Sequence, residues 1–172
     1  MSKKYSPTTK VLPRRPAVYL GIDPGTTRIG YGVIQDVGGI FTCLDYGIVD
    51  NPGRDRIADF TATHHAIQTL IVKHRPVASA VEKLFFFKNH KTIMPVGEMR
   101  GVIMLAIGQT GTPIYEQTPL QVKKTICNYG MADKKQVQRM VQTILRLEKP
   151  IQPDDAADAL ALAICAAVTH TQ

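Results

Sequence analysis

The N-terminal part of the chain has the pattern of three β-strands joined by short turns. Apolar and β-branched residues fill Ala17–Asp23, and the run ends at Pro24-Gly25, a turn signal. Two further runs, Ile29–Gln35 and Ile40–Val49, are separated by Gly38-Gly39. Because short turns join antiparallel neighbours, this pattern predicts a three-stranded antiparallel meander.

Helical and strand patterns alternate along the rest of the chain. Five apolar residues recur at helical spacing within Ile57–His74 and predict one buried helix face: Ile57, Phe60, Ile67, Leu70 and Ile71. The other predicted elements are a buried strand Ala78–Glu82, a helix within Thr92–Gln109, a strand Pro113–Glu116, a helix opened by Thr118-Pro119, an amphipathic helix Asp133–Leu145 and a last helix from Pro153 and Asp154 to about Ala167. Pro95 leaves the start of the helix within Thr92–Gln109 open and predicts a local bend there, because proline fits only the first helical turn without strain.

This order of elements indicates an α/β fold. The long helical connections permit the first and fourth strands to pair in parallel. We therefore expect a mixed five-stranded sheet with helices on both faces.

Composition fits one packed domain. The chain has 172 residues, of which 44% are apolar and 20% charged, so wholesale disorder is not expected. We interpret residues 1–16 as a basic flexible tail and residues 17–172 as the folded domain. The longest apolar run, Ala159–Val168, is too short to cross a bilayer, and no secretory signal is recognised. Three separated cysteines form neither a disulfide framework nor a metal motif, which favours a reducing, cytoplasmic location.

The net charge of +7 is unevenly distributed. Residues 1–15 carry no acid, and residues 83–139 form a basic middle between two acidic stretches. This arrangement indicates a polyanion-binding surface beside an acidic site. The alternative is a solvated surface with chance clustering of charge.

Four acidic residues stand out because they end or begin elements that pack. Asp23 and Glu82 each end an apolar strand, so parallel pairing of those strands brings both carboxylates to one edge of the sheet. Asp155 and Asp158 open the last helix three residues apart, which places them on one face. Alanines around them allow that helix to approach the sheet closely.

Four carboxylates without balancing bases repel one another, and divalent cations relieve that repulsion. Mg²⁺ and Mn²⁺ prefer oxygen ligands, and two such ions suit phosphodiester cleavage. Simpler roles stay open: a turn cap for Asp23, a surface charge for Glu82, and helix-dipole stabilisation for the acids of the last helix. We assign Asp154 to the N-cap and Asp155 to the ligand set, although Asp154 also shares a face with Asp158.

These residues resemble the RuvC family of Holliday-junction resolvases over roughly residues 17–170. The joint order and spacing of the motifs is specific, although each one alone is weak. The motifs are Gly21-Ile22-Asp23-Pro24-Gly25, Gly30-Tyr31-Gly32, Val81-Glu82, Lys88-Asn89, Gly97, Arg100-Gly101-Val102, Gln121-Val122-Lys123, Ala132-Asp133-Lys134, Gln136-Val137 and Asp155-Ala156-Ala157-Asp158-Ala159-Leu160-Ala161.

The resemblance implies a ribonuclease-H-like fold, a homodimer and Mg²⁺- or Mn²⁺-dependent nicking of four-way junction DNA, with two ions per active site. It implies that the RuvA and RuvB branch-migration proteins are partners. Carried over by position, the catalytic acids are Asp23, Glu82, Asp155 and Asp158. Phe85 matches an aromatic residue near the junction centre, where stacking on an unpaired base is worth about 1–3 kcal/mol. The candidate DNA-binding residues are Phe85, Lys88, Lys123, Lys124, Lys134 and Lys135.

Departures from the family pattern are few: Ile29, Asn128, Pro95, the basic tail and the run Phe85, Phe86 and Phe87. Three other functions are compatible with part of the pattern. Residues 21–27 also resemble the first phosphate loop of actin-like ATPases, but no second such loop follows. The remaining two are a junction-binding protein without catalysis and a nuclease of the same fold acting on other branched DNA.

Overall fold

The computed structural model describes residues 15–53, 55–84 and 90–171. The chain forms one five-stranded sheet in the order β3-β2-β1-β4-β5. Strands β1, β2 and β3 pair antiparallel, whereas β4 pairs parallel with both β1 and β5. The elements in chain order are β1 (Ala17–Asp23), β2 (Arg28–Val37), β3 (Ile40–Asp50), α1 (Arg56–His74), β4 (Ala78–Glu82), α2 (His90–Gly108), β5 (Ile114–Gln117), α3 (Pro119–Cys127), α4 (Lys134–Ile144) and α5 (Asp154–His170).

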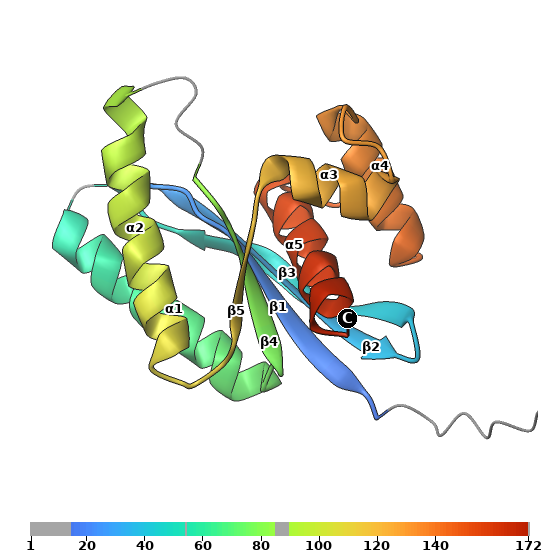
Figure 1. Cartoon of the computed structure of the whole chain (residues 1–172). Helices are drawn as coiled ribbons and strands as arrows, with labels where there is room; N and C mark the ends of the chain where they lie inside the picture. Colours follow the sequence, from blue (N-terminus) through green and yellow to red (C-terminus); the bar gives the residue numbers. More distant parts are fainter. Residues whose placement is uncertain (1–14, 54, 85–89, 172) are drawn as a thin grey trace, which may run out of the picture.

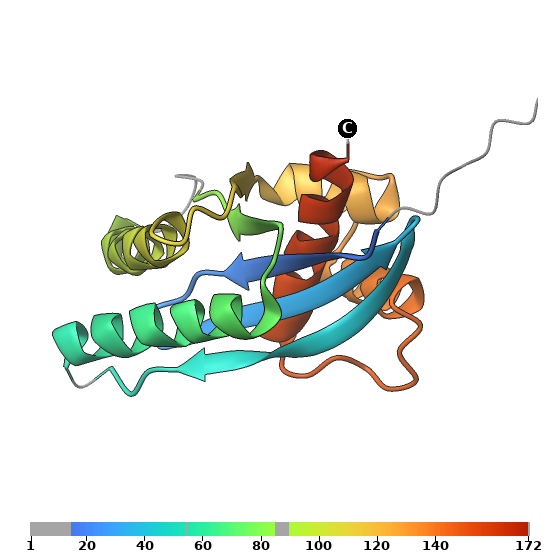
Figure 2. The ribbon, with the colours of Figure 1, turned by 90° about the horizontal axis from the view of Figure 1, so that it is seen from below.

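Helices cover both faces of this sheet, so the predicted fold class is confirmed. Helices α1 and α2 lie on one side, and α5 crosses the other side with α3 and α4 beside it (Figures 1 and 2). The mixed pairing places the C-terminal ends of β1 and β4 at the same edge of the sheet. The N-terminus of α1 follows β3 at this edge.

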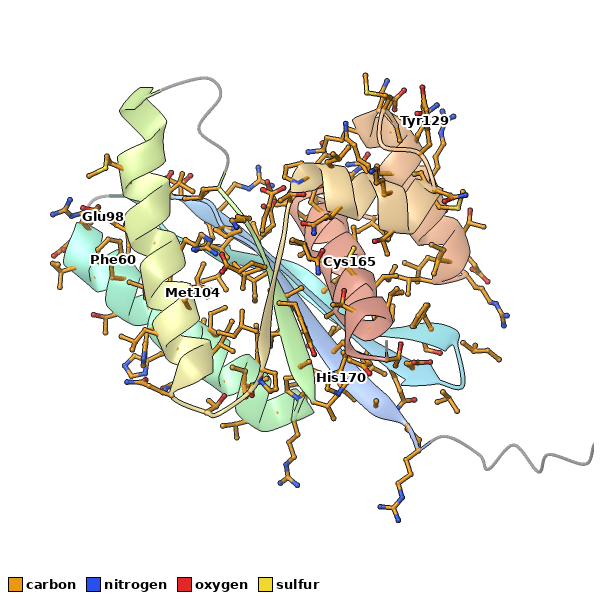
Figure 3. The ribbon with its side chains drawn as sticks, in the orientation of Figure 1. Phe60, Glu98, Met104, Tyr129, Cys165 and His170 are labelled. Atoms are coloured by element: carbon orange, nitrogen blue, oxygen red, sulfur yellow. The ribbon has the colours of Figure 1, made fainter. Side chains whose placement is uncertain are left out.

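Alternation along β1 builds two separate cores. Tyr19 faces a cluster formed mainly by α5, and Leu20 faces a cluster formed with α1 and α2. Figure 3 shows Cys165 on α5, and Phe60 and Met104 on the other side of the sheet. Helix α5 is apolar almost all round because it lies between the sheet and the α3–α4 pair.

Side-chain caps fix the ends of several helices. Asp55 caps α1, while Thr118 and Asp133 form capping boxes at the starts of α3 and α4. Asn128 ends α3 in the left-handed region at φ 52°, a conformation that asparagine adopts more readily than most residues.

Two local expectations are wrong. Ile57 is 66% exposed, because the buried face of α1 runs through Asp59, Thr63, Ile67 and Ile71 instead. Helix α2 already begins at His90 and contains Pro95 in its interior.

Most of the proposed N-terminal tail lies outside the described residues, and β1 begins at Ala17. Within the part of the chain that the structure describes, no helix is long and apolar enough to cross a membrane. The three cysteines are free thiols, and Cys165 is buried.

Candidate active site

Asp23 and Glu82 lie next to each other at the ends of two parallel strands. The register pairs Ile22 of β1 with Val81 of β4, so the following residue of each strand is the acid. Both side chains are half-buried. The sheet edge predicted from the sequence therefore brings these two carboxylates together.

Glycines let α5 bring its own acids against that edge. A Cβ on Gly30 would lie 2.0 Å from the carbonyl oxygen of Asp155, and one on Gly32 would lie 2.7 Å from the amide nitrogen of Leu160. Only glycine allows this approach, because real Cβ contacts are essentially never closer than 3.0 Å. The first two turns of α5, with Asp155 and Asp158, consequently rest beside β1 and β2.

The carboxylates perturb one another strongly. Burial, followed by the charges of Glu82, Asp158 and Asp155 in that order, raises the pKa of Asp23 from 3.8 to about 8, although Lys134 opposes the shift. Burial and then Asp158 raise the pKa of Glu82. The pKa of Asp158 is also raised, mainly by burial, although Lys134 opposes this shift. All four predicted acids therefore gather at one site.

Two basic side chains reach into this acidic cluster. Arg28, the first residue of β2, places Nη2 2.8 Å from Oδ2 of Asp155. Lys134, the first residue of α4, places Nζ 3.0 Å from Oδ2 of Asp158 and 3.5 Å from Oδ2 of Asp154. By its resemblance to the family, Lys134 was expected to lie near DNA or near the active site, and the structure pairs it with the acids. The sequence analysis did not predict Arg28 as a residue of this site. Its position at the start of a strand, close to the turn that follows Asp23, could have indicated it.

A cavity of about 210 Å³ opens beside the acids. Lys123 and Lys134 line it together with Glu82 and Asp158. Lys124 follows Lys123 on α3 and Lys135 follows Lys134 on α4, and both are exposed. The apolar part of the wall comes from Pro119, Val122, Val137 and Leu162.

The assignment of Asp154 as a helix cap is wrong. The N-cap of α5 is Pro153, with extended backbone at φ −74° and ψ 174°, and no side chain caps this helix. The Pro153 carbonyl oxygen accepts hydrogen bonds from the amides of Ala156 and Ala157 at 3.0 and 3.4 Å. Asp154 thus falls within the first turn, where its carboxylate faces Lys134.

Arg100 on α2 supports the end of β4. Its Nε donates a 3.0 Å hydrogen bond to the backbone carbonyl of Glu82, and its Nη2 donates to the carboxylate of Glu116 on β5. Glu98, also on α2, pairs with Arg56 of α1.

Phe85 and Lys88 lie outside the described residues. As the side chains stand, no group of three or more His, Cys, Asp or Glu residues in the described ranges is arranged to hold a metal ion.

Comparison with known proteins points to one family. A sequence profile described as crossover junction endodeoxyribonuclease RuvC matches residues 19–166. The protein of that name from Petrotoga mobilis is 48% identical over 149 residues, covering 86% of this chain and 91% of its own. The one from Moorella thermoacetica is 48% identical over 147 residues, covering 85% and 88%.

Solved structures agree with the sequence comparison. The structure described as T. thermophilus RuvC in complex with Holliday junction substrate superposes with a TM-score of 0.81 at 33% identity, covering 86% of this chain and 91% of the other. The yeast mitochondrial Holliday junction resolvase Ydc2 superposes with a TM-score of 0.57 at 14% identity, covering 85% and 77%, and shares the fold.

Proposed function

The chain belongs to the RuvC family of crossover junction endodeoxyribonucleases, and we propose that Asp23, Glu82, Asp155 and Asp158 are the residues with which it cuts Holliday junctions. One observation carries this assignment: four carboxylates from three elements gather at one edge of the sheet, where burial and mutual repulsion raise the pKa of Asp23 to about 8. Such crowding costs stability in a protein without a ligand. It is typical of a site selected for function.

We propose Mg²⁺ or Mn²⁺ as the cofactor, with two ions per active site. The donor set fits, because it consists only of carboxylate oxygens, the ligands these ions prefer. When bound, such ions lower the pKa of a water molecule and neutralise the leaving 3′ oxygen of the phosphodiester, which leaves a 5′-phosphate nick.

The chain itself supplies rigid placement and positive charge. Asp23 and Glu82 are fixed by paired strands, and Arg100 holds the Glu82 backbone. Lys123 lines the cavity next to the acids, which supports a role for it in contacting a phosphate of the scissile strand. Lys124 and Lys135 extend the basic surface on the exposed sides of α3 and α4. For Phe85 and Lys88 the proposal rests on the sequence alone.

A homodimer matches the two-fold symmetry of a four-way junction, because two symmetric cuts need two identical sites. Two exposed apolar side chains on helix α2, Met94 (71% exposed) and Leu105 (57% exposed), support this proposal. Partnership with RuvA and RuvB is proposed from family membership.

A nicking assay tests the proposed function. Each strand of a synthetic four-way junction is labelled in turn, and cutting is compared with a linear duplex and a flap, with Mg²⁺ and with chelator. We expect paired, symmetric, Mg²⁺-dependent nicks confined to the junction. Cuts that favour the flap would replace the substrate by other branched DNA, and tight binding without cuts would indicate a binding protein.

A further inference from the structure

Resting on the proposed active site, we propose that Arg28 and Lys134 are built-in counter-ions that occupy the carboxylates of α5 before metal binds and are displaced when it does. In this state Asp155 and Asp158 point toward the basic side chains, and binding of the divalent ions releases them. The two bases thereby set how tightly the site holds metal.

The first observation is that each acid of the pair has its own base. Arg28 comes from the start of β2 and lies 2.8 Å from Asp155, whereas Lys134 comes from the start of α4 and lies 3.0 Å from Asp158. The bases thus reach the start of α5 from two different elements. Both are tethered by rigid elements, since β2 pairs with β1 and β3, and Asp133 caps α4 through a capping box.

The second observation concerns the position of Lys134 within the cluster. Its ammonium lies within salt-bridge distance of Asp158 and Asp154 and lines the cavity that Glu82 also lines. A cation at this place neutralises the same oxygens that a divalent ion needs. Because an ammonium and a divalent ion repel each other at a few ångströms, the two compete for the cluster.

The third observation is the arrangement of the acids. Although four carboxylates gather at this edge, the described side chains contain no group of three such residues arranged to hold a metal ion. Side chains of Asp155 and Asp158 that turn from their bases toward Asp23 would complete the ligand set.

Lysine labelling tests the displacement directly. The full chain is treated with an amine-acetylating reagent, without metal and at saturating Mg²⁺, and the modification of each lysine is measured by mass spectrometry. We expect labelling of Lys134 to increase by up to about fivefold with Mg²⁺, because an ammonium released from its ion pairs reacts more readily. Lys135 is the internal control, since it is exposed and adjacent on α4. Equal labelling of Lys134 with and without Mg²⁺ would overturn the proposal.

Calorimetric titration with Mg²⁺, at one fixed pH for all variants, gives an independent readout. Lys134→Gln should bind Mg²⁺ about tenfold more tightly than wild type, and Arg28→Gln should shift affinity in the same direction. Lys135→Gln removes the same charge one residue away and should stay within about twofold of wild type. Equal affinities of Lys134→Gln and Lys135→Gln would refute the counter-ion role while leaving the metal site intact. If wild type does not bind Mg²⁺, or if Asp23→Asn binds it as tightly as wild type, both the proposed metal site and the counter-ion role are refuted.

Discussion

Replacing Gly30 by alanine tests how the acids of α5 reach the sheet. Gly30 pairs with Asp23 in the β1–β2 ladder and lies under the first turn of α5. The added methyl group would lie 2.0 Å from the carbonyl oxygen of Asp155, 2.5 Å from its carbonyl carbon and 3.2 Å from its Cβ. All three atoms belong to one of the proposed metal ligands.

The size of the effect follows from these contacts. The methyl group and the carbonyl oxygen must separate by about 1 Å to reach even 3.0 Å. The two closest atoms, the carbonyl oxygen and carbonyl carbon of Asp155, belong to the backbone and not to a flexible side chain. Overpacking of this kind typically costs about 1–3 kcal/mol, which lowers the melting temperature by about 2–12 °C in a chain of this size. A displacement of about 1 Å at a reacting centre costs about a hundredfold in rate. We therefore expect nicking to fall far more than stability.

The assay compares junction-nicking rate and thermal melting for wild type, Gly30→Ala and Gly108→Ala. Gly108 ends α2, and a Cβ there meets nothing within 4 Å, so its replacement should change neither quantity appreciably. If Gly30→Ala nicks junctions at the wild-type rate and has the wild-type melting temperature, the close approach of α5 to the sheet does not position the acids.

Three further predictions concern the same site. Arg100→Gln removes the donor to the Glu82 carbonyl and should slow nicking about tenfold with junction binding unchanged, as measured by gel shift; weaker binding with normal cutting would contradict its supporting role. Because the folded-state pKa of Asp23 is about 8 against 3.8, the metal-free folded chain retains a proton that the unfolded chain loses, so its stability should fall as pH rises from about 4 to 8. Melting temperatures measured with chelator should therefore fall less for Asp23→Asn than for wild type as pH rises over that range. Parallel plots of melting temperature against pH for the two proteins would exclude the shifted pKa. Asp155→Ala should impair cleavage more than Asp154→Ala, since Asp155 contributes to the Asp23 shift; the reverse order would make Asp154 the ligand.

The sequence carried enough information for the sheet and for the acidic edge. Asp23 and Glu82 end apolar runs whose length and flanking turns define strands, so their shared edge follows from parallel pairing. The spacing of Asp155 and Asp158 places them on one helix face wherever that helix packs. The strand ends and the helix spacing are local features of the sequence, and the shared edge depends only on the parallel pairing of β1 with β4, so all of them could be predicted.

Other features depend on contacts between distant elements and could not be read from local pattern. The buried face of α1 includes Asp59, whose carboxylate accepts a hydrogen bond from the Gly53 amide, and apolar periodicity does not register such a residue. The pairing of Arg28 and Lys134 with α5 depends on the relative placement of β2, α4 and α5. The error at Asp154 arose because Pro153 adopts extended backbone and takes the cap position.

The most direct test of the account is the separation of cutting from binding in Asp23→Asn. This change keeps the shape of the side chain and removes the carboxylate whose pKa is raised by all three other acids. The variant and wild type are compared on the same labelled four-way junction, by gel shift with chelator and by nicking with Mg²⁺. We predict that Asp23→Asn binds the junction about as tightly as wild type and does not nick it. Nicking near the wild-type rate would contradict the assignment of this cluster as the catalytic site.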